Sequence, residues 1–182
     1  MTAMIHPNDS EKALAWPDAL YQVLRDAGVT CASYVPDAGH ARLIELFRAD
    51  PEVAATVLTT EEEGVAMAAG AHLGGSRAVL LMQSSGVGNT INMLSLPIHC
   101  RMPLFTLVTM RGEWGEFNPW QVPMGSSTGP VLQAAGVHIR RAERADEVVE
   151  LVAASARLAY DCAIPVAVLL SQRLIGAKVW VK

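Results

Sequence analysis

Residues 78–89, AVLLMQSSGVGN, are the most informative stretch of this sequence for the fold. Its first five residues, Ala78 to Met82, carry no charge, and a continuously apolar strand is typical of the middle of a parallel sheet, where both faces are buried. The polar, glycine-containing segment Gln83 to Asn89 follows, and a helical pattern then continues to Leu96. A strand, a short loop and a helix in this order predict an α/β protein.

The same alternation continues on both sides of this stretch. Further strands are expected at 30–35, 53–58, 104–109, 137–140 and 166–170, and helices at 19–27, 43–47, 61–73 and 146–160. Residues 110–129 are rich in Gly, Pro and Trp without a helical period, so we expect a long loop there and a short helix at 131–135. The prediction is a doubly wound, mostly parallel sheet of about six strands with helices on both faces.

The composition limits the possible classes of protein. The 182 residues are 51% hydrophobic and 18% charged, which excludes a disordered chain, and no apolar run reaches transmembrane length. The net charge is −4 and Lys and Arg do not cluster, so neither a nucleic acid nor a membrane is an expected partner. We expect an N-terminal extension at residues 1–15 and one domain at residues 16–182.

Cysteine usage and the N-terminus suggest a cytoplasmic protein. Cys31, Cys100 and Cys162 are widely spaced without a C-x-x-C pair, which predicts neither a disulfide framework nor a zinc site. The stretch Met1 to Lys12 lacks the basic start and apolar core of a secretory signal.

Polar loops are expected at four strand ends, where ligands bind in doubly wound sheets: 36–40, 59–63, 83–92 and 111–121. The segment Gly86 to Ile91 begins like a dinucleotide-binding fingerprint, but Ile91 stands where the third glycine is required. Thr60 and Glu63 have the spacing of a capping box, which is a purely structural explanation for the acidic run at 61–63.

Together, these loops resemble the pyrimidine-binding domain of thiamine diphosphate-dependent 2-oxoacid decarboxylases. The resemblance is greatest to the separate alpha subunit of sulfopyruvate decarboxylase and to phosphonopyruvate decarboxylase, and it covers roughly residues 20–172. The similar stretches are YVPD at 34–37, EEEGVAMAAGAHL at 61–73, MQSSGVGNTIN at 82–92, and RGE at 111–113 with Gln121.

The resemblance implies roles for particular residues. In this family a glutamate nine residues before a glycine contacts the aminopyrimidine ring, and counting back from Gly70 selects Glu61. Its carboxyl group, hydrogen-bonded to ring nitrogen N1′, promotes the imino tautomer of the cofactor, so that the 4′ nitrogen can take the proton from thiazolium C2. The resemblance implies a catalytic role for Asp37 beside the reacting carbon, cofactor contacts from Pro36, Glu61, Ser85, Gly86, Gly88 and Asn89, and substrate contacts from Asp37, Ser84 and Gln121.

The sequence departs from the family at three points. Val87 replaces a common Pro, Ser84 stands where phosphonopyruvate enzymes usually carry Asn, and Trp120 replaces Phe. These changes leave the exact 2-oxoacid open.

A Gly-Asp-Gly motif is absent from the sequence. In this family that motif, in a second domain, holds the diphosphate and Mg²⁺ of the cofactor. The resemblance therefore implies a lyase that is active only with a second subunit, in a heterotetramer or larger assembly, with Mg²⁺ held by that partner and not by this chain. Two alternatives stay open: a related carboligase or lyase acting on a different 2-oxoacid, and a non-catalytic α/β regulatory module.

Overall fold

A computed structural model of the chain describes residues 3–5 and 16–179. Its main feature is a six-stranded sheet in which all neighbouring strands are parallel, in the order β3-β2-β4-β5-β7-β6. The strands are β2 (Val29–Tyr34), β3 (Ala54–Val57), β4 (Arg77–Gln83), β5 (Leu104–Thr109), β6 (His138–Ala142) and β7 (Pro165–Leu170). The predicted α/β class is confirmed, and β4 lies in the interior of the sheet as its apolar sequence indicates.

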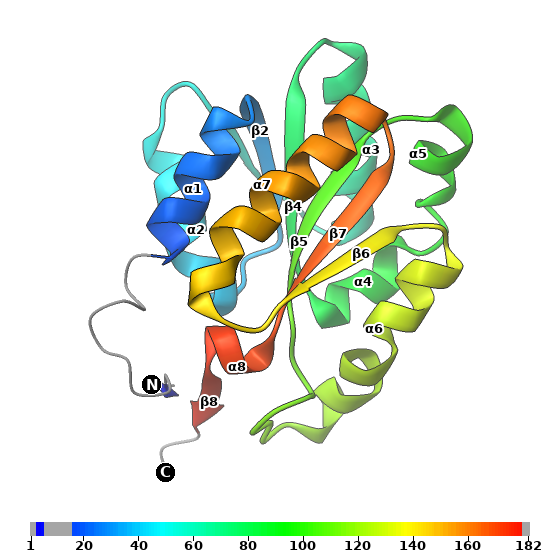
Figure 1. Cartoon of the computed structure of the whole chain (residues 1–182). Coiled ribbons are helices and arrows are strands. Elements are labelled where there is room, and N and C mark those ends of the chain that lie inside the picture. Colours follow the sequence, from blue (N-terminus) through cyan, green and yellow to red (C-terminus); the bar gives the residue numbers. More distant parts are fainter. Residues whose placement is uncertain (1–2, 6–15, 180–182) are drawn as a thin grey trace.

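Helices cover both faces of this sheet (Figure 1). One face carries α1 (Trp16–Asp26), α2 (Ala41–Ala49) and α7 (Ala145–Cys162); the other carries α3 (Glu61–Leu73), α4 (Ser84–Thr90), α5 (Ser95–Cys100) and α6 (Val122–Ala134). A hydrophobic cluster lies on each side, and alternate residues of β4 and β5 contribute to the two clusters. All six residues of β5 are buried.

A second, smaller sheet was not expected from the sequence. The strands β1 (Ala3–Ile5) and β8 (Ala177–Val179) pair antiparallel, and the short helix α8 (Gln172–Ile175) precedes β8. Elements of three or four residues are too short to show a periodic pattern. The expected N-terminal extension, residues 1–15, lies outside the described residues except for β1.

The predicted loop after β4 is wrong. Helix α4 begins at Ser84, directly after the last residue of β4, and the expected longer helix is divided into α4 and α5. The glycines that indicated a loop are inside α4. A Cβ at Gly86 would collide with the side chain of Glu61, so glycine is required there by close packing and not by a turn.

The predicted long loop at 110–129 is also wrong in its second half, because α6 already begins at Val122. Gly125 lies inside this helix, where a Cβ would collide with the carbonyl oxygen of Arg111. Pro123 occupies the first turn, where a missing N–H costs nothing. Three hydroxyl groups donate to carbonyl oxygens four residues earlier, Ser126 to Val122, Ser127 to Pro123 and Thr128 to Met124.

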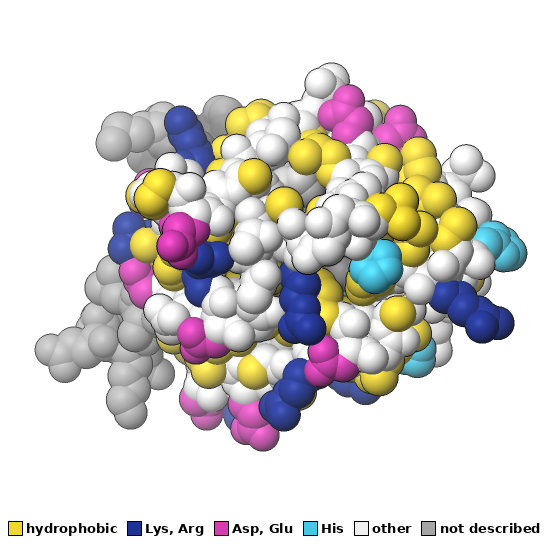
Figure 2. All heavy atoms as spheres, turned by 90° about the horizontal axis from the view of Figure 1, so that it is seen from above, with side chains coloured by type: hydrophobic (Ala, Val, Ile, Leu, Met, Phe, Trp, Pro, Cys, Tyr) yellow, Lys and Arg dark blue, Asp and Glu magenta, His cyan; other side chains and the backbone are white. Residues whose placement is uncertain are grey.

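The carboxyl ends of the parallel strands meet at the lower end of the molecule in Figure 1, together with α8 and the segment after β5. Figure 2 shows the opposite end, where acidic and basic side chains are interspersed with apolar ones. Within residues 3–5 and 16–179, no helix combines the length and hydropathy that a bilayer crossing requires.

Candidate active site

The three acidic residues in the first turn of α3, residues 61–63, lie in different environments. Glu63 caps the helix, because its Oε2 accepts hydrogen bonds from the backbone nitrogens of Thr59 at 2.8 Å and Thr60 at 3.5 Å. Glu62 is exposed, whereas only 7% of Glu61 is exposed. The capping explanation is therefore correct for Glu63, and it leaves the burial of Glu61 unexplained.

The carboxylate of Glu61 lies between α3 and α4. Its Oε2 accepts a hydrogen bond of 2.8 Å from Nδ2 of Asn89, and its Oε1 packs against Gly86. An Asn side chain can donate to a carboxylate and so fix its orientation. Glu61 and Asn89, two of the predicted cofactor-binding residues, are thus brought together from separate parts of the chain.

We expect Gly86→Ala to destabilise the chain by about 1–3 kcal/mol, because the added methyl group must displace the Glu61 carboxylate. Gly88→Ala is the matched control in the same helix, since its Cβ would lie 3.6 Å from the Met124 sulfur, an ordinary contact. Urea unfolding of the two variants measures the difference. Equal stability of the two variants would contradict the close packing of Glu61 on Gly86.

Asp37 is held by three hydrogen bonds at the end of β2. Its Oδ1 accepts from Nε2 of Gln83 at 2.8 Å, and its Oδ2 accepts from Oγ1 of Thr109 at 2.7 Å and from the backbone nitrogen of Gly39 at 3.0 Å. Burial alone would raise the pKa of Asp37, but nearby His40 and these hydrogen bonds together lower it. Asp37 is therefore an oriented carboxylate at neutral pH. Ser85 extends the network by donating to Oε1 of Gln83 at 2.9 Å.

His40, three residues after Asp37, is buried against the sheet. Its Nε2 lies 3.2 Å from the carbonyl oxygens of both Met82 and Leu107, so this nitrogen carries the hydrogen and donates to β4 and β5. Burial lowers the pKa of His40 more than the charge of Asp37 raises it. Near neutral pH the ring is uncharged, and the three hydrogen bonds keep Asp37 ionised.

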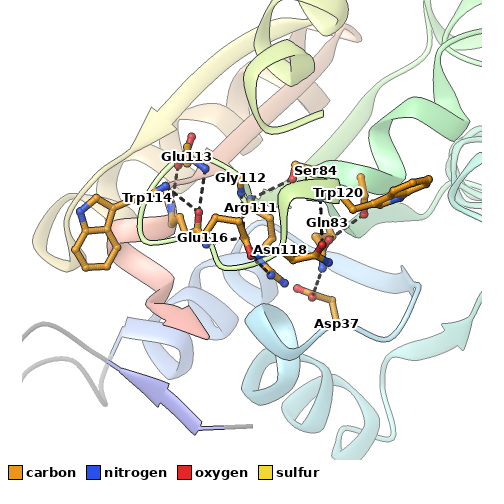
Figure 3. A network of polar contacts seen from close by, with 12 residues as sticks. Asp37, Gln83, Ser84, Arg111, Gly112, Glu113, Trp114, Glu116, Asn118 and Trp120 are labelled. Atoms are coloured by element: carbon orange, nitrogen blue, oxygen red, sulfur yellow. Dashed lines mark hydrogen bonds and ion pairs between the residues drawn. The ribbon is translucent and has the colours of Figure 1, made fainter. Parts of the chain in front are cut away.

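A buried ion pair between Arg111 and Glu116 stabilises the segment after β5, residues 111–121 (Figure 3). Nε and Nη2 of Arg111 each donate to one carboxylate oxygen of Glu116 at 2.6 Å. The buried amide of Gln172 in α8 joins this pair to the backbone of residues 113–114. The sequence resemblance included Arg111 but not Glu116 or Gln172, which become neighbours only through the fold.

Of the predicted substrate residues, Ser84 contacts the start of this segment and Gln121 lies at its end. Ser84 is fully buried, and its hydroxyl oxygen accepts a hydrogen bond of 3.1 Å from the backbone nitrogen of Arg111. Oε1 of Gln121 is buried and has no hydrogen-bond partner within the described residues, so the amide has an unused acceptor. Trp120 is 86% exposed, and Figure 3 shows its ring and that of Trp114 directed away from the network on opposite sides.

The residues at this edge fit one half of a thiamine diphosphate site. A buried, oriented carboxyl group beside a glycine matches what an aminopyrimidine nitrogen requires, and the free acceptor of Gln121 lies on the segment after β5. A diphosphate would need cations or a metal. Within the described ranges, no three side chains of His, Cys, Asp or Glu are grouped to hold a metal ion.

Comparison with known proteins gives the same assignment. Residues 16–116 match the family described as thiamine pyrophosphate enzyme, N-terminal TPP binding domain. Sulfopyruvate decarboxylase subunit alpha of Methanothermobacter thermautotrophicus is 40% identical over 124 residues, 68% of this chain and 75% of that protein. The corresponding subunit of Methanococcus maripaludis is 32% identical over 154 residues, 84% of this chain and 92% of that protein.

Two longer proteins contain a region similar to this chain. Phosphonopyruvate decarboxylase of Streptomyces viridochromogenes is 38% identical over 111 residues, which are 60% of this chain and 28% of that protein. Among solved structures, 2-oxoglutarate:ferredoxin oxidoreductase from Magnetococcus marinus superposes with a TM-score of 0.68 at 13% identity. The match covers 97% of this chain but only 30% of that one, and it supports the fold alone.

Proposed function

This chain belongs to the thiamine pyrophosphate enzymes, and we propose that it is the alpha subunit of a thiamine diphosphate-dependent decarboxylase. Its substrate is a small anionic 2-oxoacid of the sulfopyruvate or phosphonopyruvate type. The observation that carries the proposal is the buried Glu61 carboxylate, oriented by Asn89 at the carboxyl end of the sheet. Helix capping accounts for Glu63 but not for this arrangement.

Thiamine diphosphate, when bound, supplies the carbon that attacks the 2-oxo group and accepts the electrons left by carbon dioxide. In our proposal Glu61 holds a proton at the nitrogen N1′ of its pyrimidine ring, and Asn89 keeps that carboxyl group in position. Gly86 allows the close approach of α4 to Glu61. Pro36, Ser85 and Gly88 complete the contacts that we assign to this half of the cofactor.

Asp37 acts on the substrate side in this proposal. Three donors fix its orientation and its lowered pKa keeps it ionised, so it can accept a proton or a hydrogen bond but does not arrive as an acid. The unused acceptor of Gln121 supports the assignment of a polar substrate contact there. Ser84 remains a predicted substrate residue, and its contact with Arg111 adds a role in holding the segment after β5.

We expect Asp37→Asn to slow turnover by about 10²-fold while the affinity for the cofactor stays nearly unchanged. The amide fits the site if the Gln83 side chain flips, so the fold is retained. Asp26→Asn, at the exposed end of α1, is the control for loss of a charge. Cofactor titration and steady-state kinetics distinguish a loss of turnover from a loss of cofactor affinity. If the variant bound the cofactor more weakly and regained turnover at saturating cofactor, Asp37 would be a cofactor-binding residue and not a residue that acts on the substrate.

A second subunit supplies the diphosphate and Mg²⁺ half of the site in this proposal. The relatives are named as alpha subunits, which supports the existence of a partner. The outward face of α3 suits a protein contact, because Leu73 is 74% exposed, Met67 is 39% exposed, and a Cβ at Gly70 would meet no atom within 4 Å. Glu61 and Gly70 are about two and a half helical turns apart, so one faces the site and the other this surface. We propose a heterotetramer as the smallest complete assembly.

The experiment that tests the function is an assay of the assembled enzyme with a panel of 2-oxoacids that includes sulfopyruvate and phosphonopyruvate. We expect carbon dioxide release with an anionic member of the panel and an aldehyde as the product. A condensation product instead would favour the alternative carboligase. No reaction with any acid, in an assembly that binds the cofactor, would favour the non-catalytic module.

The cysteine usage supports a reducing compartment such as the cytoplasm for this subunit.

A further inference from the structure

Gln172 is a fully buried residue to which none of the roles above has been assigned. It is the first residue of α8, after the end of β7, and four hydrogen bonds join it to the segment after β5. Its Oε1 accepts from the backbone nitrogens of Glu113 at 3.0 Å and Trp114 at 2.9 Å, while its Nε2 donates to Oε2 of Glu116 at 2.9 Å. Its own backbone nitrogen donates to Oε1 of Glu113 at 2.8 Å.

Glu116, the acceptor of the Gln172 amide, is a buried charge with an unusually complete set of donors. It accepts from Arg111, from Gln172, and from the backbone nitrogens of Gly112 and Asn118. Burial alone would raise the pKa of Glu116, but these donors lower the pKa to about 2. Removing one partner from such a cluster is costly, because a buried charge is then left uncompensated.

The cluster holds a segment that has little regular structure of its own. Gly112 has φ +77°, a left-handed conformation, and a Cβ there would collide with the backbone of Gln121. The turn at Gly112 thus brings the start of the segment against its end, where Gln121 has its unused acceptor. The side chain of Arg111 is committed to Glu116 and lies near the ring of Phe117, with 5.9 Å between the guanidinium carbon and the ring centroid.

We propose that Gln172 is a positioning residue that, with Arg111 and Glu116, forms a clamp holding residues 111–121 in the conformation that binds substrate. The inference rests on the proposed function, since it assigns Gln121 to the substrate side of that site. A segment ordered before binding costs no conformational entropy when the substrate arrives. The clamp therefore acts on the apparent affinity for substrate and not on the activation of the cofactor through Glu61.

Gln172→Glu tests the clamp with a change of nearly equal size. The new carboxylate keeps an acceptor for the nitrogens of Glu113 and Trp114, but it faces Glu116 where the amide now donates. The introduced carboxyl group and that of Glu116 would lie within hydrogen-bond distance, so the two groups share a proton and one of them titrates with a raised pKa. The charged groups around this position are Glu113, Glu116 and Arg111 on the segment, Arg141 and Glu143 at the end of β6, and Arg173 in α8.

We expect the KM of Gln172→Glu in the assembled enzyme to be close to wild type at acidic pH and to rise by about tenfold as the shared proton is lost. Below the raised pKa the proton restores the hydrogen bond; above it the two charges repel each other. Exchange of the cofactor C2 proton should stay at the wild-type rate. In the free chain, backbone amide exchange at Glu113 and Trp114 should accelerate over the same pH range. Gln133→Glu, exposed on α6, is the control and should follow the wild-type pH profile.

A KM equal to that of wild type at every pH, with accelerated amide exchange, would overturn the proposal, because the clamp would then be structural only. Unchanged amide exchange would overturn it as well. If Gln172→Glu does not assemble, Gln172→Met removes all three side-chain hydrogen bonds without adding a charge, and an unchanged KM in that variant overturns the proposal. If the wild type acts on no 2-oxoacid, the proposed function fails, whereas the amide exchange of the free chain still reports on the clamp.

Discussion

Glu61→Gln lowers the turnover of the assembled enzyme by about 10²–10⁴-fold, the usual contribution of a general acid or base, and leaves the fold intact. The amide is close to the carboxylate in shape and can still accept a hydrogen bond from Asn89. It cannot take up and release the proton that our proposal places between this side chain and the pyrimidine ring. The loss therefore appears in turnover and in exchange of the cofactor C2 proton, both measured with saturating cofactor.

The neighbouring carboxylates are the matched controls for this prediction. Glu62 is exposed, so Glu62→Gln should leave both turnover and stability near wild type. Glu63 caps α3, so Glu63→Gln should cost up to about 1 kcal/mol of stability without a comparable loss of turnover. Circular dichroism confirms that each variant is folded. A Glu61→Gln enzyme within about threefold of wild type would remove Glu61 from the mechanism.

The fold could be predicted wherever burial leaves a periodic or continuous pattern. The predicted strand at 104–109 has the bounds of β5, and the predicted helix at 61–73 has those of α3. Both elements are long enough for side-chain pattern to identify them, and β5 lies in the interior of the sheet, where no polar face interrupts the apolar run. Glu61 is the first residue of α3, and the family resemblance, not the helical pattern, selected it from the three acidic residues there.

The parts that could not be predicted depend on tertiary contacts. Gly86 and Gly125 indicate loops by local propensity, yet both lie in helices, at positions where a neighbouring group leaves no room for a Cβ. The hydrogen bond between Gln172 and Glu116 joins residues 56 positions apart, and no spacing rule connects them. Thr109, which donates to Asp37 across 72 positions, was missed for the same reason.

The chain purified alone is expected neither to bind thiamine diphosphate tightly nor to release carbon dioxide from any 2-oxoacid. A diphosphate carries several negative charges and needs a metal or a group of donors. The chain has a net charge of −4, and its site edge presents the ionised carboxylate of Asp37, while the nearby Arg111 is already paired with Glu116. The electrostatics of this half of the site therefore oppose the anionic half of the cofactor.

Activity should appear only when a second chain with the Gly-Asp-Gly domain is added, with one cofactor bound for each pair of chains. Calorimetry with cofactor and Mg²⁺, followed by an assay of carbon dioxide release, measures both steps with this chain, the partner and the mixture. Leu73→Glu, on the outward face of α3, should weaken assembly, because it places a charge in the proposed contact. Glu61→Gln should assemble and bind the cofactor yet fail in turnover, which separates assembly from chemistry. Stoichiometric binding and turnover by this chain alone would show that no partner is needed, and that the diphosphate is held by residues of this chain.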